Sequence, residues 1–206
     1  IETRYFTELT TGQVAKNMIG TFWFQLNEIN AGGSRPKGFA PSVTRRVGVL
    51  GAGMMGAGIA YVSAAAGIEV VLKDVSLQAA EKGKAYSATL LDKKVSRGHM
   101  SAEKRDAFLA LIKPSDNEAD FAECDLIIEA VFEDRELKAK VTAAAEQHAL
   151  SDAVIASNTS TLPITGLAKA VAKAEKFIGL HFFSPVDKMP LVEIIRGEHT
   201  SDETLA

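Results

Sequence analysis

The chain has 206 residues, which is enough for one sizeable domain with additional segments or for two small domains. Hydrophobic residues make up 47% and charged residues 24%, as in typical globular proteins, and a net charge of −3 argues against a nucleic-acid-binding face. No apolar run reaches the length of a membrane span, no signal-peptide pattern is present, and the single cysteine, Cys124, excludes an internal disulfide. Because no two histidines have metal-ligand spacing and there is no second cysteine, no metal site is expected.

Residues 1–30 are predicted to be helical, because apolar residues recur at spacings of three and four along one stripe. The stripe consists of Val14, Met18, Phe22, Leu26 and Ile29. It requires a surface to pack on, either this chain's own main domain or another domain of a longer protein. The chain begins with Ile1 rather than Met, so we expect it to be a piece of a longer protein. Residues 31–44 carry Gly, Pro and Ser without periodicity and are predicted to be a linker.

A glycine pattern follows the first predicted strand, at about residues 46–50. Gly51, Gly53 and Gly56 form G-x-G-x-x-G, with Met54 and Met55 opening a predicted helix at about 54–66. Gly51 permits a tight turn, Gly53 lets the backbone approach a pyrophosphate, and Gly56 lets the helix pack on its strand. The helix N-terminus then faces the phosphates, so the pattern predicts a dinucleotide site. The alternative is a glycine-rich turn that only packs a helix.

Asp74 strengthens the dinucleotide interpretation. It ends a second predicted strand, at about residues 69–73, and lies about twenty residues after the glycines, where such folds bind the adenosine ribose. Since a 2′-phosphate would be repelled by the carboxylate, Asp74 favours NAD over NADP.

The remaining pattern alternates between helices and strands. Helices are predicted at 76–97, from Ser101, at 134–149 and at 164–171, and strands at 125–131, 154–157, 177–183 and 191–196. Thr200 with Glu203 resembles a capping box, and the helix that it would start is expected to be cut short at Ala206. Alternation of this kind predicts an α/β Rossmann-type fold with a doubly wound, mostly parallel sheet over residues 45–206.

Three segments place polar residues at the carboxyl ends of these strands, where open parallel sheets bind ligands. They are residues 131–133 with Lys138, residues 157–161, and His181. All three segments are expected to approach the nicotinamide half of a dinucleotide.

His181 is the natural proton acceptor, because an imidazole titrates near neutrality and removal of a hydroxyl proton needs such a base. Glu193 lies in an apolar strand, where a carboxylate is costly to bury unless it is paired, and pairing with His181 would fix the tautomer. Spacing alone also allows a structural histidine and a surface glutamate. Ser160 lacks the G-x-S-x-G pattern of a nucleophile, so we expect it to donate a hydrogen bond to a substrate oxygen.

Several segments resemble L-3-hydroxyacyl-CoA dehydrogenases. Residues 181–186 and 189–193 are similar to the family's active-site segment, and residues 157–160 and 125–133 also match it. The similarity runs from about Arg45 to the end of the chain. Residues 1–41 are similar to the segment before the dehydrogenase in multifunctional fatty-acid oxidation proteins.

The resemblance implies a role for each matching residue. His181 would be the catalytic base and Glu193 its partner, with Ser160 near the reacting oxygen and the nicotinamide. The implied cofactor contacts are Gly51, Gly53, Met54, Met55, Gly56, Asp74, Glu133, Lys138 and Ser160, and the implied CoA contacts are Ser87 and Lys94. Ser184 departs from the pattern, because many relatives have Asn there and a hydroxyl cannot make the same two-ended amide contacts.

The implied activity is the NAD-dependent oxidation of (S)-3-hydroxyacyl-CoA to 3-oxoacyl-CoA in fatty-acid β-oxidation, in the bacterial cytoplasm. The implied partners are an upstream enoyl-CoA hydratase domain, a downstream helical domain and a thiolase subunit, with no nucleic acid and no membrane. Two alternatives stay open: a related 3-hydroxyacid or hydroxybutyryl-CoA dehydrogenase, and a non-catalytic NAD-binding module of a larger assembly.

Overall fold

The structure is a computed structural model that describes residues 1–40 and 42–206. The chain forms two compact units, Ile1–Ala40 and a second unit that runs to Leu205. Pro41, which belongs to the predicted linker 31–44, lies outside the described residues. No helix in the described ranges combines the length and the hydropathy that crossing a bilayer requires.

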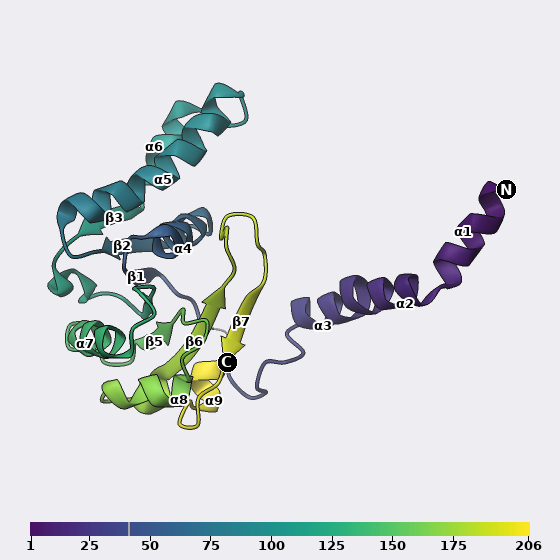
Figure 1. The fold of residues 1–206 in the computed structure, drawn as a ribbon. Helices are drawn as coiled ribbons and strands as arrows, with labels where there is room; N and C mark the ends of the chain where they lie inside the picture. The colour runs from purple at the N-terminus through teal and green to yellow at the C-terminus, as the bar shows by residue number, and fades with distance from the viewer. Residues whose placement is uncertain (41) are drawn as a thin grey trace. The chain divides into compact units, whose positions relative to one another are not determined.

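The first unit is helical over the predicted range. Its elements are α1 (Glu2–Thr11), α2 (Gln13–Ile19), a π-helical stretch η1 (Gly20–Gln25) and α3 (Leu26–Asn30) (Figure 1). The helix is interrupted at Gly12, whose backbone is extended. The predicted apolar stripe is exposed along its whole length, from Val14 to Ile29. Both predicted packing surfaces for the stripe, this chain's own main domain and another domain of a longer protein, therefore stay predictions.

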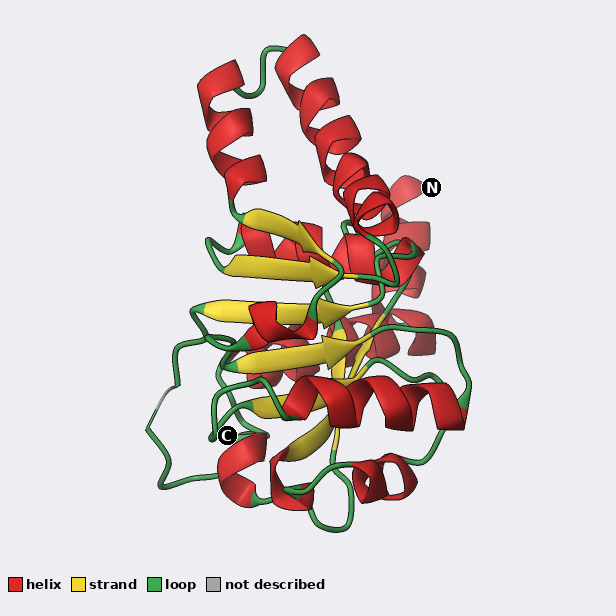
Figure 2. Ribbon diagram, turned by 90° about the vertical axis from the view of Figure 1, so that its left-hand side faces the viewer, coloured by secondary structure: helices red, strands yellow, loops and turns green. Residues whose placement is uncertain are grey.

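The second unit contains a seven-stranded sheet with the order β3-β2-β1-β4-β5-β6-β7. The strands are β1 (Arg46–Leu50), β2 (Glu69–Lys73), β3 (Ile112–Ser115), β4 (Leu126–Glu129), β5 (Val154–Ser157), β6 (Phe177–Phe182) and β7 (Val192–Ile195). The pairs from β3 to β6 are parallel, and only β7 runs antiparallel, against β6 (Figure 2). The predicted mostly parallel, doubly wound sheet is confirmed, with its switch point between β1 and β4.

Helices cover both faces of this sheet. They are α4 (Met54–Ala65), α5 (Leu77–Ser96), α6 (Ala102–Ala110), α7 (Arg135–Glu146), α8 (Ile164–Leu167) and α9 (Asp202–Leu205). Figure 2 shows α5 and α6 as a hairpin that extends beyond the β3 edge of the sheet. Side chains alternate between two cores: Val70 and Leu72 pack with Ile59 of α4, whereas Val71 packs in the cluster that contains Ala145 of α7.

Two local predictions need correction. β3 was not expected, because its sequence, Ile-Lys-Pro-Ser, lacks apolar alternation; Pro114 is tolerated there since β3 is an edge strand. The capping box at Thr200 is also wrong. Ser201 caps α9 by accepting the Thr204 N–H at 3.1 Å, while Thr200 is buried and its hydroxyl donates to the Phe177 carbonyl at 2.6 Å.

Candidate functional site

The glycine loop joins β1 to α4 as the sequence predicts. Gly51 has a φ of +93°, a conformation that favours glycine. A Cβ on Gly56 would lie 1.7 Å from the Gly51 carbonyl oxygen, so only glycine allows the helix to start this close to the strand. A Cβ on Gly53 would meet nothing within 4 Å, and Gly53 is the N-cap of α4 without a side chain to cap it. The start of α4 is therefore open to a phosphate group.

Asp74 is tied to this loop. Its Oδ2 accepts the Ala52 N–H at 2.6 Å and its Oδ1 accepts the Val75 N–H at 2.7 Å. Asp74 and the loop line one side of a pocket of about 480 Å³, and apolar side chains that include Val131, Phe132 and Leu137 line the other. An apolar slot with a carboxylate at its rim suits an adenosine group, so these residues fit the cofactor that the fold implies.

A buried ion pair lies at the carboxyl ends of β4 and β5. Lys138 Nζ is 2.8 and 3.1 Å from the two carboxylate oxygens of Glu129, and the two residues are 2% and 0% exposed. Glu129 also accepts from the Ser157 hydroxyl at 2.6 Å and from the Val131 N–H at 2.7 Å. Glu129, the last residue of β4, is thus connected to β5 through Ser157 and to α7 through Lys138, and Val131 of the segment after β4 is its third donor.

Glu133 binds the loop after β5. Its Oε1 accepts from the Thr159 hydroxyl and from the Ser160 and Thr161 N–H groups at 3.0 Å each, and its Oε2 lies 3.1 Å from Lys138 Nζ. Burial alone would raise the pKa of Glu133, but the hydrogen bonds from Thr159 and Thr161 and the ion pair with Lys138 lower it to about 2. The carboxylate is therefore charged at any working pH.

His181 and Glu193 come together on the paired strands β6 and β7. They are direct ladder partners, and His181 Nδ1 lies 2.7 Å from Glu193 Oε2. The predicted reason for this contact is wrong, however. Glu193 is not buried in an apolar strand: its side chain is 52% exposed, because β7 is the edge strand. The antiparallel register, and not a burial penalty, brings the two side chains together.

Ser160 lies in the loop between Glu133 and the His181 strand. The Asn158 side chain accepts the Phe182 N–H at 2.8 Å and so joins this loop to the end of β6. Ser160 is exposed, and its N–H is bound to Glu133. Its hydroxyl is thus available at the same edge as the imidazole. Ser184, the position that departs from the family, lies just beyond β6 with its hydroxyl 3.9 Å from the sulfur of Met54.

The two residues predicted to contact CoA, Ser87 and Lys94, both lie on α5. Ser87 is buried, 1% exposed, and its hydroxyl has no hydrogen-bond partner within the described residues. Lys94 is exposed and donates to the Tyr61 hydroxyl at 2.8 Å, with Nζ 5.6 Å from the ring centroid. The structure thus offers Lys94 to a ligand, while Ser87 is covered in this conformation.

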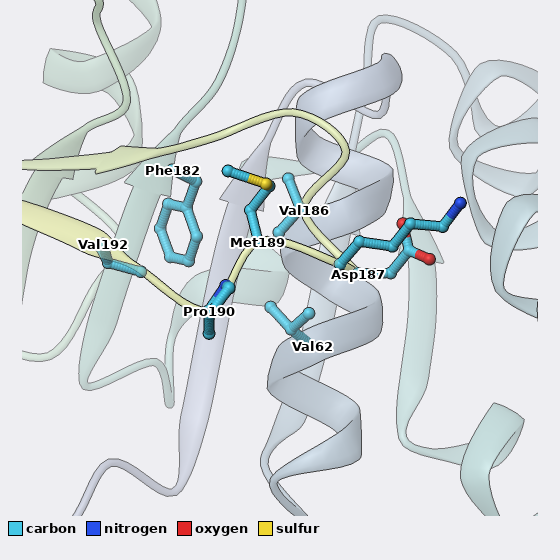
Figure 3. Close-up of a pocket in the computed structure, with 8 residues that line it drawn as sticks. Val62, Phe182, Val186, Asp187, Met189, Pro190 and Val192 are labelled. Atoms are coloured by element: carbon cyan, nitrogen blue, oxygen red, sulfur yellow. The ribbon is translucent and has the colours of Figure 1, made fainter. Parts of the chain in front are cut away.

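A second pocket lies on the opposite face of β6 from His181. It has a volume of about 290 Å³ and is lined by Val62 of α4 and by residues of the β6–β7 strands and loop, including Phe182, Val186 and Met189 (Figure 3). Phe182 and Val192 point into it and alternate along their strands with His181 and Glu193, so the pocket is separate from the His–Glu pair.

Sequence reasoning assigned no role to two residues of the site, Glu129 and Asn158, although Asn158 belongs to the predicted segment 157–161. Glu129 carried a signal that could have been used, since a carboxylate within an apolar strand needs a partner. The place of Asn158 at a strand end was predictable, but its partner was not, because a side chain that binds a backbone N–H 24 residues away leaves no local pattern.

Residues 46–206 match the family model described as the 3-hydroxyacyl-CoA dehydrogenase, NAD binding domain. The chain therefore belongs to this family, whose domain binds NAD. Among solved structures, (S)-3-hydroxybutyryl-CoA dehydrogenase from Ralstonia eutropha is 42% identical with a TM-score of 0.76, and the match covers 79% of this chain and 58% of that one. A 3-hydroxybutyryl-CoA dehydrogenase from Escherichia coli K12 is 34% identical with a TM-score of 0.76, over 80% of this chain and 35% of that one.

The dehydrogenase part of multifunctional enzyme 1 from Caenorhabditis elegans is 29% identical with a TM-score of 0.69, over 81% of this chain and 38% of that one. The chain spans less than two thirds of each of these three proteins. The activity of a whole enzyme is therefore a matter of proposal for this chain.

Proposed function

We propose that this chain supplies the NAD site and the general base of an enzyme that oxidises (S)-3-hydroxyacyl-CoA to 3-oxoacyl-CoA. The observation that carries the proposal is the 2.7 Å contact between His181 and Glu193. The glycine loop and Asp74 follow β1 and β2, on one side of the switch point, and His181 lies near the end of β6, on the other side. A general base and a dinucleotide site would therefore lie along the same edge of the sheet.

The glycine loop, Met54 and Met55 would hold the pyrophosphate, and Asp74 the adenosine ribose. When bound there, NAD would supply the acceptor for the hydride of C3 of the acyl chain. Glu133 would border the nicotinamide half of the dinucleotide, and the buried Lys138 would act on it only through its ion pair with Glu133. Since Asp74 repels a 2′-phosphate, we expect the site to use NAD rather than NADP.

His181 would take the hydroxyl proton of the substrate at Nε2. Its Nδ1 faces Glu193, so Nε2 is the nitrogen left to accept a proton. The Glu193 carboxylate would orient the ring and stabilise the imidazolium that forms. Ser160 would donate a hydrogen bond to the reacting oxygen, and Lys94 and Ser87 would contact CoA, Ser87 after a local rearrangement that exposes it.

We place this chain in fatty-acid β-oxidation, within a multifunctional protein of the bacterial cytoplasm. The support is the similarity of residues 1–41 to the segment before the dehydrogenase in such proteins, and a relative that is itself the dehydrogenase part of a multifunctional enzyme. An upstream enoyl-CoA hydratase domain, a downstream helical domain and a thiolase subunit would be the partners.

A second candidate is a hydroxybutyryl-CoA dehydrogenase, favoured by the names of the Ralstonia and Escherichia relatives. Turnover of hydroxyacyl-CoA substrates of increasing chain length separates the two, since a β-oxidation enzyme should accept long chains. A non-catalytic NAD-binding module is the third alternative, and it leaves the His181–Glu193 pair without a use.

The test is NADH formation from 3-hydroxybutyryl-CoA, comparing this chain with one extended through the helical domain of the family. We expect this chain to bind NAD but to turn over slowly, because the helical domain would form one wall of the substrate cleft. Misplacement of the reacting carbon by about 1 Å can cost on the order of 10²-fold in rate. Equal turnover of the two chains would mean that the active site has been misplaced.

A further inference from the structure

Three charged side chains, Glu129, Glu133 and Lys138, meet between the carboxyl end of β4 and the first turn of α7. Lys138 Nζ lies 2.8 Å from Glu129 and 3.1 Å from Glu133, so one cation faces two carboxylates. Within the described residues, neither carboxylate has a second cationic partner within 4.0 Å. The cluster therefore carries a surplus of one negative charge.

The surplus charge is located on Glu133. Glu129 is fully buried and has the shorter contact with Lys138, 2.8 Å, so these two residues form the neutral, buried pair of the cluster. Glu133 has a side chain that is 38% exposed, and its remaining contacts are neutral hydroxyl and N–H donors from residues 159–161. Such donors stabilise the carboxylate without cancelling its charge, so the field of Glu133 reaches the site.

Glu133 lies on the nicotinamide side of the switch point. The pocket that Asp74 lines reaches from the end of β2 to residues 130–132 after β4. A dinucleotide that binds with its adenosine at Asp74 and crosses the switch point places its other half over β4 and β5. The loop that Glu133 holds follows β5. An oxidised nicotinamide ring carries a positive charge, and reduction by hydride removes it.

We propose that Glu133 acts as an electrostatic selector of the cofactor's oxidation state, favouring NAD⁺ over NADH. The inference rests on the proposed function and deepens it. As the substrate is oxidised, one positive charge disappears from the nicotinamide and another appears on His181, which faces Glu193. Glu133 thus serves as the counter-ion of the nicotinamide before hydride transfer, and Glu193 serves as the counter-ion of the imidazolium after it.

The experiment is calorimetric measurement of the dissociation constants of NAD⁺ and NADH for this chain and its variants. In Glu133→Gln, the ratio of the NADH constant to the NAD⁺ constant should fall on the order of tenfold, a change within reach of one partly buried unit charge. Glu133→Asp keeps the charge but weakens the loop contacts, so both affinities should fall and the ratio should hold. Glu136→Gln, an exposed position in the first turn of α7, removes the same charge and should leave the ratio within about twofold.

The outcomes separate the two hypotheses. Equal loss of NAD⁺ and NADH affinity in Glu133→Gln, or the same altered ratio in Glu133→Asp, would overturn the selector role and leave the proposed function intact. Failure of the parent chain to bind either dinucleotide would overturn the proposed function itself. If Glu133→Gln does not fold, the test is the salt dependence of binding to the parent chain. The ratio of the NADH to the NAD⁺ dissociation constant should fall as the salt concentration rises, because Glu133 is partly exposed and its charge is screened. A ratio independent of salt would contradict the selector role.

Discussion

His181 and Glu193 face each other across the antiparallel pair β6–β7, with Nδ1 2.7 Å from Oε2. Ladder pairs on both sides, Leu180 with Ile194 and Phe182 with Val192, fix the register. Since side chains alternate along a strand, a slip by one residue would send Glu193 to the other face of the sheet. The alignment of the base with its carboxylate is therefore a property of the backbone pairing.

Removal of the base should slow turnover strongly without loss of cofactor binding. For His181→Ala in the chain extended through the helical domain, we expect the rate to fall by roughly 10²–10⁴-fold, the usual contribution of a general base. NAD affinity should hold, because His181 lies at β6 and the glycine loop at β1. Steady-state NADH formation and calorimetry measure the two effects, and a near-normal rate would exclude His181 as the base.

Asp74 should determine the choice between NAD and NADP. The parent chain should bind NAD far more tightly, and Asp74→Ala should narrow the difference, since the carboxylate repels a 2′-phosphate. Asp74 also accepts the Ala52 N–H, so the variant should lose some NAD affinity through a looser glycine loop. Calorimetry with both dinucleotides tests this, and equal affinities in the parent chain would refute the assignment.

Glu129 should matter for stability more than any exposed carboxylate. Glu129→Gln removes the buried partner of Lys138 and places an amide against three donors, from Ser157, Val131 and Lys138. Breaking a buried pair in this way costs about 3–5 kcal/mol in the free energy of unfolding.

Urea denaturation measures the loss, with Glu81→Gln, an exposed position on α5, as the control expected to change stability by less than about 0.5 kcal/mol. Comparable stability of the two variants would show that the Glu129–Lys138 pair is not held as described.

The contrast between Glu129 and Glu193 shows what local sequence can reveal. Both carboxylates lie in apolar strands, and the same rule, that such a carboxylate needs a partner, applies to each. The rule holds for Glu129, which is fully buried, but not for Glu193, which lies on an exposed edge strand. Which strand lies at an edge depends on strand order, a non-local property that periodicity does not contain.

The glycine loop and the alternation of helices and strands were predictable because each is a local pattern. β3 was not, because its four residues include a lysine and a proline and take strand geometry only by pairing with β2. The contacts of Glu133 with residues 159–161 also join segments about 26 residues apart, which spacing alone could not specify.

Glu133 should make stability depend on acid pH. The folded state lowers its pKa from 4.5 to about 2, so its contribution to stability is fully present above about pH 4.5 and is lost as the pH falls toward 2. Glu133→Gln should therefore flatten the fall in unfolding free energy over this range. Urea midpoints measured at several pH values test it, and an unchanged slope would show that Glu133 is not held in its ion pair in solution.

The same added methyl group should destabilise the fold at Gly56 but not at Gly53. A Cβ on Gly56 would lie 1.7 Å from the Gly51 carbonyl oxygen, a backbone atom that cannot move aside, so Gly56→Ala should lose more than the 1–3 kcal/mol typical of overpacking. A Cβ on Gly53 meets nothing within 4 Å, so Gly53→Ala should keep its stability to within about 1 kcal/mol.

The open space at Gly53 is where a pyrophosphate would approach the backbone, so Gly53→Ala should lose NAD affinity while it remains folded. Thermal unfolding should show that Gly56→Ala is destabilised and that Gly53→Ala is not. Calorimetry should then show that the folded Gly53→Ala variant has lost NAD affinity. If Gly53→Ala bound NAD as tightly as the parent chain, the phosphates would have to lie elsewhere than at the start of α4, and the dinucleotide site would need to be redrawn.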